Sequence, residues 1–520
     1  MYEDSRPLAD SITFDSVKPW QSEDGTFYVF LPSFADTNNL SVENKTRKKI
    51  TIDGGAVEET LKVDLNEKHD IVFGKQREHI VFMKSANLPA VFIDTDSGNM
   101  DYVNKEKGNK ESAEAVIIDT AGKTVLSEKI SVSGHGNGAW IRFKKKSINV
   151  AFKEPVSVLG MNPSRNWVLL SNSVEATNIR TKLVYDFASK AKLRWTPRGE
   201  PADVYLNGEY AGLYLLAERI EAAPNKMNLS DKDFLGQLKS KTMIGKNDAA
   251  FLIDGGSYFE IKFPVNPSER RLSEIEKSVK DASRAILNNS DNLFDILNLD
   301  SFARMFLIDE IFMDMDADIN SSYYYSDGGK ICAGPAWDYD RSMANMNSDV
   351  TNLKIKYPDQ IYCAEPYNMP YSGDISCLRY SRLYRNKRFR QRLAEIYKNE
   401  YRALLVNTVK DISVLGETVS ASDAMESVRY KAMRQLYDAE YYKDTREEIS
   451  DIKSLLEAHL AFLDSVFIDG KNYKSVWFVD PDFRTKPPKS RFIPELYIID
   501  HRAVEVGSKV ENVLRKKMYI

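Results

Sequence analysis

Short apolar runs separated by turn residues dominate the first 130 residues of the chain. The runs are rich in β-branched residues, and turn residues such as Asp53-Gly54-Gly55 stand between them. Five runs carry the pattern: Ile50–Ile52, Ile71–Phe73, Ile80–Met83, Ala90–Ile93 and Ala115–Ile118. Strands of this length with frequent turns are typical of a β-sandwich. The pattern therefore predicts a β-sandwich-like module over residues 1–128.

Strand and helix patterns alternate after this module. Ser147–Phe152 has the composition of a strand, and residues 178–190 have helical spacing. The sequence Asn207-Gly208 lies between two apolar runs in Val204–Leu216, which predicts a hairpin with a type I′ turn.

Helical periodicity takes over from about residue 272. Apolar positions repeat at spacings of four, three and four residues at Ile275, Val279, Ala282 and Ile286. Ser301–Met313 is apolar nearly all round, which predicts a buried helix, with Asp300 as its N-cap. The expected fold class is α+β, with a domain over residues 129–470 that is helical from about 380 and an extended C-terminal arm over 471–520.

Composition narrows the class of protein. A chain of 520 residues is too long for one core. The net charge of −4 offers no basic field for nucleic acid, and no apolar run reaches the length of a transmembrane span. No signal peptide is visible at the N-terminus. Five scattered histidines lack zinc-ligand spacing, and Cys363 and Cys377 are either a bridged pair or free thiols.

The most informative segment is the acidic stretch Asp314–Asp340. It holds six aspartates and Asn320, with a predicted hairpin between its two acidic clusters. The hairpin brings both clusters to the same edge of a small sheet. Carboxylates at close quarters repel, so a cation or a proton is needed. The sequence therefore predicts a divalent-metal site that holds a phosphorylated ligand.

Other interpretations of the acidic stretch are weaker. A calcium loop fails because Ile319 stands where glycine is needed and Tyr325 where a bidentate glutamate is needed. A solvated acidic loop does not suit the apolar segments on either side. A glycan-acting enzyme would need paired carboxylates across an open groove.

A kinase-type site fits the acidic stretch better. The order helix, Asp316, hairpin and Asp338 matches the catalytic and metal-binding aspartates of protein kinases.

The chain resembles the spore coat protein H (CotH) family of atypical kinases. The resemblance rests on segments that occur in the family's order. They are Gly134–Trp140, Lys145–Phe152, Leu159–Met161, Trp167–Asn172, Ile179–Leu183, Tyr205–Glu218, Asp316 and Trp337–Asp340. It covers residues from about 130 to 345, with similarity extending into the helices up to about 467.

The resemblance implies an atypical protein-kinase-like fold, ATP, Mg²⁺ (or Mn²⁺) and phosphate transfer to protein hydroxyls. It makes Asp316 the catalytic aspartate, Asp338 and Asp340 the metal ligands, and Asn320 a substitute for the usual asparagine. It places Gly136 and Asn137 over the nucleotide. For the remaining roles it gives several candidates: Lys146 first and Lys262 second as the phosphate lysine, Glu218 as its partner or near the adenine, and Arg180 as electrostatic support or an exposed helix residue.

Five positions depart from the family and kinase patterns. His135 replaces an arginine, Ala151 replaces a lysine, and Gly138 and Ala139 replace hydroxyl residues. Ser321 stands where the kinase pattern has a metal-binding asparagine. Loss of such cations weakens phosphate neutralisation.

Two functional hypotheses therefore stand at this stage. One is an atypical metal-dependent protein kinase that acts on protein Ser/Thr hydroxyls. The other is a non-catalytic pseudokinase or cell-envelope protein that binds a surface ligand through its β-module. The family habit implies an extracytoplasmic location in either case.

Overall fold

A computed structural model describes most of the chain. The described residues are 8–46, 48–245, 248–345, 358–364, 367–368, 375–430, 445–471, 498–499 and 502–503. Strands and helices are mixed along them, which confirms the predicted α+β class. The chain divides into two compact units. Unit 1 comprises residues 1–182, 198–219 and 413–446, and unit 2 comprises 183–197, 220–412 and 447–520.

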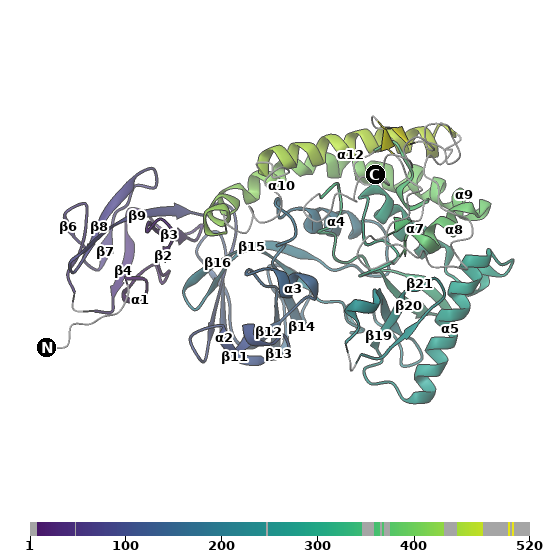
Figure 1. The fold of residues 1–520 in the computed structure, drawn as a ribbon, viewed down its shortest axis with the longest axis horizontal. Coiled ribbons are helices and arrows are strands. Elements are labelled where there is room, and N and C mark those ends of the chain that lie inside the picture. Colours follow the sequence, from purple (N-terminus) through teal and green to yellow (C-terminus); the bar gives the residue numbers. More distant parts are fainter. Residues whose placement is uncertain are drawn as a thin grey trace, which may run out of the picture. The chain divides into compact units, whose positions relative to one another are not determined.

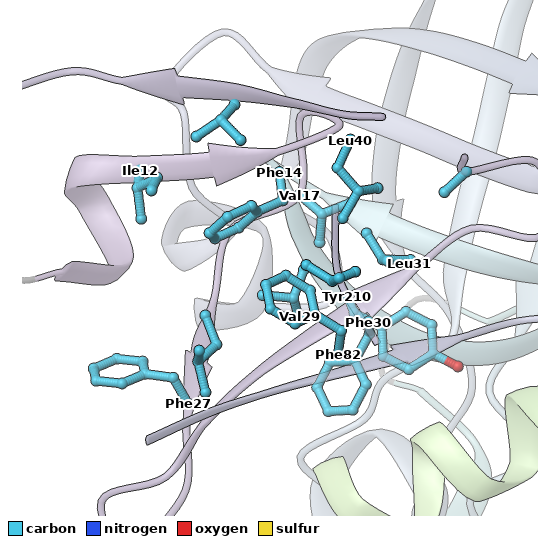
Figure 2. Packing of buried hydrophobic residues seen from close by; sticks show 14 of the residues in the cluster. Ile12, Phe14, Val17, Phe27, Val29, Phe30, Leu31, Leu40, Phe82 and Tyr210 are labelled. Carbon is cyan, nitrogen blue, oxygen red and sulfur yellow. The ribbon is translucent and has the colours of Figure 1, made fainter. Parts of the chain in front are cut away.

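Two sheets form the N-terminal part of unit 1. The first has the order β1-β4-β7 and the second the order β2-β3-β9-β8-β5-β6. Their bounds, with the short helix α1 (Leu8–Ser11), are β1 Ile12–Phe14, β2 Trp20–Gln21, β3 Phe27–Leu31, β4 Leu40–Asn44, β5 Ile50–Ile52, β6 Gly55–Ala56, β7 Thr60–Leu61, β8 Lys68–Phe73 and β9 Gln76–Lys84. Side chains from both sheets share one core, in which Phe14 meets Phe82 edge-on at 5.1 Å between ring centroids (Figure 2).

A closed barrel forms the rest of the β-structure of unit 1, in the order β10-β11-β12-β13-β14-β16-β15 (Figure 1). Its strands are β10 Ala90–Thr95, β11 Lys110–Ile118, β12 Thr124–Gly134, β13 Ile148–Val156, β14 Ser164–Leu170, β15 Gly199–Leu206 and β16 Glu209–Glu218, with short helices α2 (Asp101–Lys105) and α3 (Gly138–Arg142). Residue 128, the expected domain boundary, lies inside β12. The strands β10 and β11, which were expected in the N-terminal module, pair within the barrel.

The predicted hairpin of the barrel is present. Asn207 and Gly208 both have positive φ angles, 53° and 80°, as a type I′ turn requires. The turn joins β15 to β16, which lie against each other along their length.

Unit 2 is built on a five-stranded sheet of order β18-β19-β17-β20-β21. Its strands are β17 Leu235–Lys239, β18 Ala250–Leu252, β19 Tyr258–Phe263, β20 Tyr323–Asp327 and β21 Lys330–Ala333. Its helices are α5 Glu269–Asn288, α6 Leu293–Ile296, α7 Leu299–Ile311, α8 Leu378–Arg385, α9 Lys387–Ile396 and α12 Thr445–Phe467, with the short turns η1 Lys241–Met243, η3 Tyr362–Ala364 and η4 Tyr397–Tyr401.

A few elements remain outside these groups. The helices α4 (Arg180–Ala188) and α10 (Arg402–Arg429) each contribute residues to both units. Two-residue strands form the pairs β22 (Tyr367–Asn368) with β23 (Ile375–Ser376), and β24 (Ile498–Ile499) with β25 (Arg502–Ala503). Apart from residue 471 and the last of these pairs, the predicted C-terminal arm lies outside the described residues.

The helix before the acidic stretch is buried as predicted, but its N-cap is different. Every residue of α7 from Ser301 to Ile311 is buried. The Asn298 side chain, not Asp300, accepts the hydrogen bond from the Ser301 amide at 3.0 Å. The expectation for Asp300 was wrong because that carboxylate lies one residue inside the helix. It is paired instead with Arg304 and Arg392.

The cysteines are buried free thiols. The Cys363 thiol is hydrogen-bonded with Cys377, and burial raises the pKa of Cys363 well above its usual value. Among the described helices, none combines the length and apolar character that a membrane crossing requires.

Candidate active site

The hairpin of β20 and β21 brings the two acidic clusters of unit 2 together. The Ser321 hydroxyl donates a hydrogen bond of 3.0 Å to Oδ2 of Asp338, seventeen residues further along the chain. The Asn320 amide donates to Oδ1 of Asp316 at 3.4 Å, and Nη1 of Arg341 lies 3.8 Å from the same oxygen. Asp316 and Asp338 thus belong to one small polar site, with the arginine at its edge.

Mutual repulsion is evident at this site. Burial, followed by the neighbouring Asp316, raises the pKa of Asp338 to about 6. Burial and the charges of Asp309, Asp316 and Asp338 raise the pKa of Asp314 well above its usual value. A cation placed among these groups would reverse both effects, because it favours the ionised forms.

The backbone at the site adopts an uncommon conformation. Four non-glycine residues have positive φ angles between 48° and 68°: Met313, Asp318, Ser321 and Asp338. Such conformations are costly for side chains with a Cβ atom and gather at functional sites. Their clustering in this short segment supports a functional role.

A pocket lies between α7 and the hairpin. It is lined by twelve residues: Met305, Asp309, Asp314, Ser321, Ser322, Tyr323, Tyr324, Gly334, Pro335, Trp337, Tyr339 and Tyr380. In this lining, the hydroxyls of Tyr339 and Tyr380 donate to the two oxygens of Asp309 at 2.6 and 2.9 Å. Burial raises the pKa of Asp309 to about 7 despite these bonds. The lining therefore includes a buried, hydrogen-bonded carboxyl group.

The donor set suits a hard divalent cation. Within the part of the chain that the structure describes, no three His, Cys, Asp or Glu side chains are grouped to hold a metal. Mg²⁺ does not need such a cage, since it commonly uses one or two carboxylates together with substrate phosphates and water. Asp316 and Asp338 fit this requirement, and the Ser321 hydroxyl, which is bonded to Asp338, adds a third oxygen.

The amide oxygen of Asn320 is less available to a metal than expected. The amide oxygen of Asn320 accepts hydrogen bonds from both the amide and the hydroxyl of Ser240, at 2.9 and 3.0 Å. Both lone pairs of that oxygen are then used. Asp340 is half-buried. The pKa of Tyr185 is raised mainly by burial and next by the charge of Asp338, and the charge of Asp340 makes a smaller contribution.

The glycine-rich segment of unit 1 is shaped around Trp140. Any Cβ atom at Gly134 would collide with the Trp140 ring, so glycine is required there. Gly136 has a φ of 93°, and the Asn137 side chain accepts from Lys107 at 3.0 Å. The Lys146 ammonium donates to the carbonyls of Trp140 and Phe143, and burial lowers its pKa.

The remaining candidates from the sequence are ion-paired or buried. Arg180 is not exposed: its guanidinium pairs with Glu175 at 3.0 Å and both are buried. Glu218 is buried and accepts from the Arg198 amide at 2.9 Å. Lys262 is exposed and pairs with the buried Glu260 at 2.7 Å. The structure thus brings together Asp316, Asp338 and Asn320, while Lys262 lies on β19 with a carboxylate partner of its own.

Sequence reasoning missed a buried ion pair of unit 1. The Lys145 ammonium lies 2.6 Å from Oε2 of Glu426, with both side chains almost fully buried, and it stacks over the Tyr214 ring at 4.7 Å. The same carboxylate oxygen accepts from the Leu213 amide at 2.7 Å. The partners are 281 residues apart in the sequence, so no local signal identifies them.

Replacing Lys145 with methionine is expected to lower the free energy of unfolding by about 3–5 kcal/mol, because Glu426 is left buried without its cation. Urea unfolding measures this effect. The neighbouring Lys146→Met variant is a matched control. It removes bonds from a partly buried ammonium to two carbonyls and its contact with the Trp140 ring at 4.6 Å, but it leaves no buried charge unpaired, so a change of about 1 kcal/mol is expected. Equal losses in the two variants would contradict the anchoring role of Lys145.

The fold and the site define an α+β protein with a buried, paired-carboxylate centre. The comparison with family models then gives the family. The CotH kinase protein model matches residues 132–451, more than half of the chain. The chain therefore belongs to the CotH kinase protein family, as its sequence motifs predicted. The comparison with curated proteins gives no match.

Proposed function

We propose that this chain is an atypical metal-dependent protein kinase that transfers the γ-phosphate of ATP to protein Ser or Thr hydroxyls. The family match indicates a kinase-like function and a protein substrate. The observation that carries the finer proposal is the pairing of Asp316 and Asp338 through the Ser321 segment. Phosphoryl transfer depends on positioning and on charge neutralisation, and this pairing serves both.

In the proposed reaction, Asp316 orients the acceptor hydroxyl and accepts its proton. Asp338 would hold Mg²⁺ or Mn²⁺, the Ser321 hydroxyl rather than the engaged Asn320 amide would be a second donor, and Asp340 is a further ligand candidate. The metal supplies neutralisation of the phosphate charge. Arg341, near Asp316, limits the repulsion between the carboxylates when no cation is bound.

The nucleotide-binding roles rest on the family resemblance and on local geometry. Gly136 and Asn137 would approach the phosphates with their backbone amides, and Lys146 would neutralise phosphate charge. Lys146 is preferred to Lys262 because its ammonium contacts carbonyls and no carboxylate. Arg180 and Glu218 would act as buried supports, consistent with their contacts in unit 1.

The proposal includes an organisation for the chain. A kinase-like domain would extend to about residue 470 and would include the whole barrel from β10, because residue 129 lies inside β12. A β-sandwich-like module would precede it and an extended arm would follow it. The module would bind a surface ligand or direct the protein to its substrate. An extracytoplasmic location, at the cell surface, in the envelope or secreted, is proposed because the family is one of spore coat proteins.

One alternative function has a specific observation in its favour. His135 and Ala151 stand where cations are expected, and His135 is hydrogen-bonded to Asn149 at 3.0 Å. A chain with fewer phosphate-facing cations would bind a partner without catalysis, as a pseudokinase or envelope protein. A glycan-acting enzyme is not favoured, since it needs carboxylates across an open groove and not a buried pair.

The direct test is phosphate incorporation from γ-labelled ATP into protein, including the chain itself, with Mn²⁺ or Mg²⁺ and with EDTA. Metal-dependent labelling of serine or threonine is the expected result. Nucleotide binding without labelling of any acceptor would favour the pseudokinase alternative.

A further inference from the structure

Residues at and just before the start of α8 are hydrogen-bonded to the loop that carries Asp316. The Cys377 amide donates to the Ala317 carbonyl at 3.1 Å. The Ser376 hydroxyl lies 3.2 Å from the Met315 carbonyl and 3.0 Å from that of Ala317. These are the residues directly before and after Asp316. Ser376 and Cys377 belong to a segment about sixty positions away, and they therefore contact the proposed catalytic loop directly.

Arg379 provides the strongest of these contacts. Its amide donates to Oδ2 of Asp318 at 2.6 Å, its Nε lies 2.9 Å from Oδ1, and its Nη2 donates to the Asp318 carbonyl at 3.2 Å. The Tyr324 hydroxyl adds a bond of 3.2 Å to the same carboxylate. Asp318 is fully buried, and the side chain of Arg379 is 4% exposed. Asp318 therefore binds Arg379 and Tyr324 within the protein, so this aspartate of the acidic stretch is not a candidate cation ligand.

The guanidinium also contacts the turn between β18 and β19. Its Nη2 donates to the Ser257 hydroxyl at 3.2 Å and its Nη1 to the Asp254 carbonyl at 3.4 Å. The guanidinium is planar and is held by Asp318 at one end and by Ser257 and Asp254 at the other. This arrangement restricts the position of Asp318. Asp318 itself has a φ of 60°, a conformation that needs such support.

We propose that Arg379, acting through Asp318, is a positioning residue for Asp316. This role rests on the proposed kinase function. It means that the start of α8 supports the reaction without contacting the substrate. Arg379 and Ser376 hold the carbonyls and the carboxylate around Asp316, so that its side chain keeps the direction required for the acceptor hydroxyl. Lysine cannot replace this arginine, because it lacks the fork of donors.

The test compares full-length variants by steady-state kinetics with Mn²⁺ and ATP. Arg379→Lys is expected to lower kcat by about 100-fold, the cost of a misplacement of roughly 1 Å at a reacting group, with little change in KM for ATP. Glu400→Gln is the matched control, since it disturbs the Arg304–Glu400 ion pair of unit 2, which touches no residue of the loop. It is expected to keep kcat within about twofold of wild type at a similar loss of melting temperature.

A milder variant covers the case in which Arg379→Lys does not fold. Ser376→Ala removes one hydroxyl and is expected to lower kcat roughly tenfold, equivalent to one lost hydrogen bond, with KM unchanged. Wild-type kcat in both variants, or losses that match the control at equal melting temperature, would overturn the positioning role alone. A wild-type protein that transfers no phosphate would overturn the proposed function, and the positioning role with it.

Discussion

Replacing Asp316 with alanine is expected to reduce phosphate incorporation by about 10²- to 10⁴-fold, the usual contribution of a positioned acid–base group. The reduction should appear in kcat, since Asp316 is proposed to orient the acceptor and accept its proton. Metal-dependent nucleotide binding should persist, because Asp338 remains in place. Initial rates with γ-labelled ATP measure the first effect, and calorimetry measures the second.

Asp327 offers the matched control for this experiment. It belongs to the same acidic stretch, but it ends β20 at the tip of the hairpin, half-exposed and paired with Arg194 at 2.6 Å. Asp327→Ala should leave the rate within about twofold of wild type, since exposed ion pairs contribute little. An Asp316→Ala protein as active as this control would remove Asp316 from the catalytic role.

Replacing Asp338 with asparagine is expected to have two opposite effects. Without metal, the variant should be more stable than wild type at pH 7. Since the folded-state pKa of Asp338 is about 6 and the usual value is 3.8, ionisation of this group opposes folding. The gain is on the order of 1–3 kcal/mol, reduced from the full shift because the residue is partly exposed.

The raised folded-state pKa of Asp338 also predicts how the stability difference between wild type and Asp338→Asn depends on pH. The penalty is complete above pH 6 and disappears as the pH falls from about 6 towards 4, so wild type should gain stability over this range relative to Asp338→Asn. With Mn²⁺ and ATP the difference in stability shifts in favour of wild type. Wild type should gain about 2.7 kcal/mol at a ligand concentration 100 times Kd, and the variant little.

Thermal unfolding in EDTA and in Mn²⁺ with ATP, at pH 7 and pH 5, measures both effects of Asp338→Asn. Asp327→Asn again serves as the control and should shift with metal as wild type does. A variant that is less stable than wild type in EDTA and still stabilised by metal and nucleotide would show that Asp338 is not a ligand.

Local patterns were sufficient to predict much of the architecture. The Asn207-Gly208 turn between apolar runs gave its hairpin because only positive φ angles fit that turn. The periodicity of α5 placed Ile275, Val279 and Ile286 in the core, where the structure has them. Likewise the hairpin between Asp316 and Asp338 followed from residues close in the sequence, and so did the approach of the two carboxylates.

Features that depend on contacts between distant segments could not be predicted from the sequence. The barrel takes β10 and β11 because β10 pairs in parallel with β15, more than a hundred residues away. Lys145 and Lys146 are adjacent and chemically identical, and only the position of Glu426 distinguishes the buried anchor from its neighbour. In the acidic stretch, Asp318 looks like its neighbours until Arg379 is placed beside it.

Asp316 and Asp338 are proposed to form a site for a divalent cation and a nucleotide. Calorimetric titration of the full chain with ATP, with and without Mn²⁺, tests this site most directly. We expect saturable heat that requires the metal and that is lost in Asp338→Asn but kept in Asp327→Asn. Titrations of wild type that show no metal-dependent heat would contradict it.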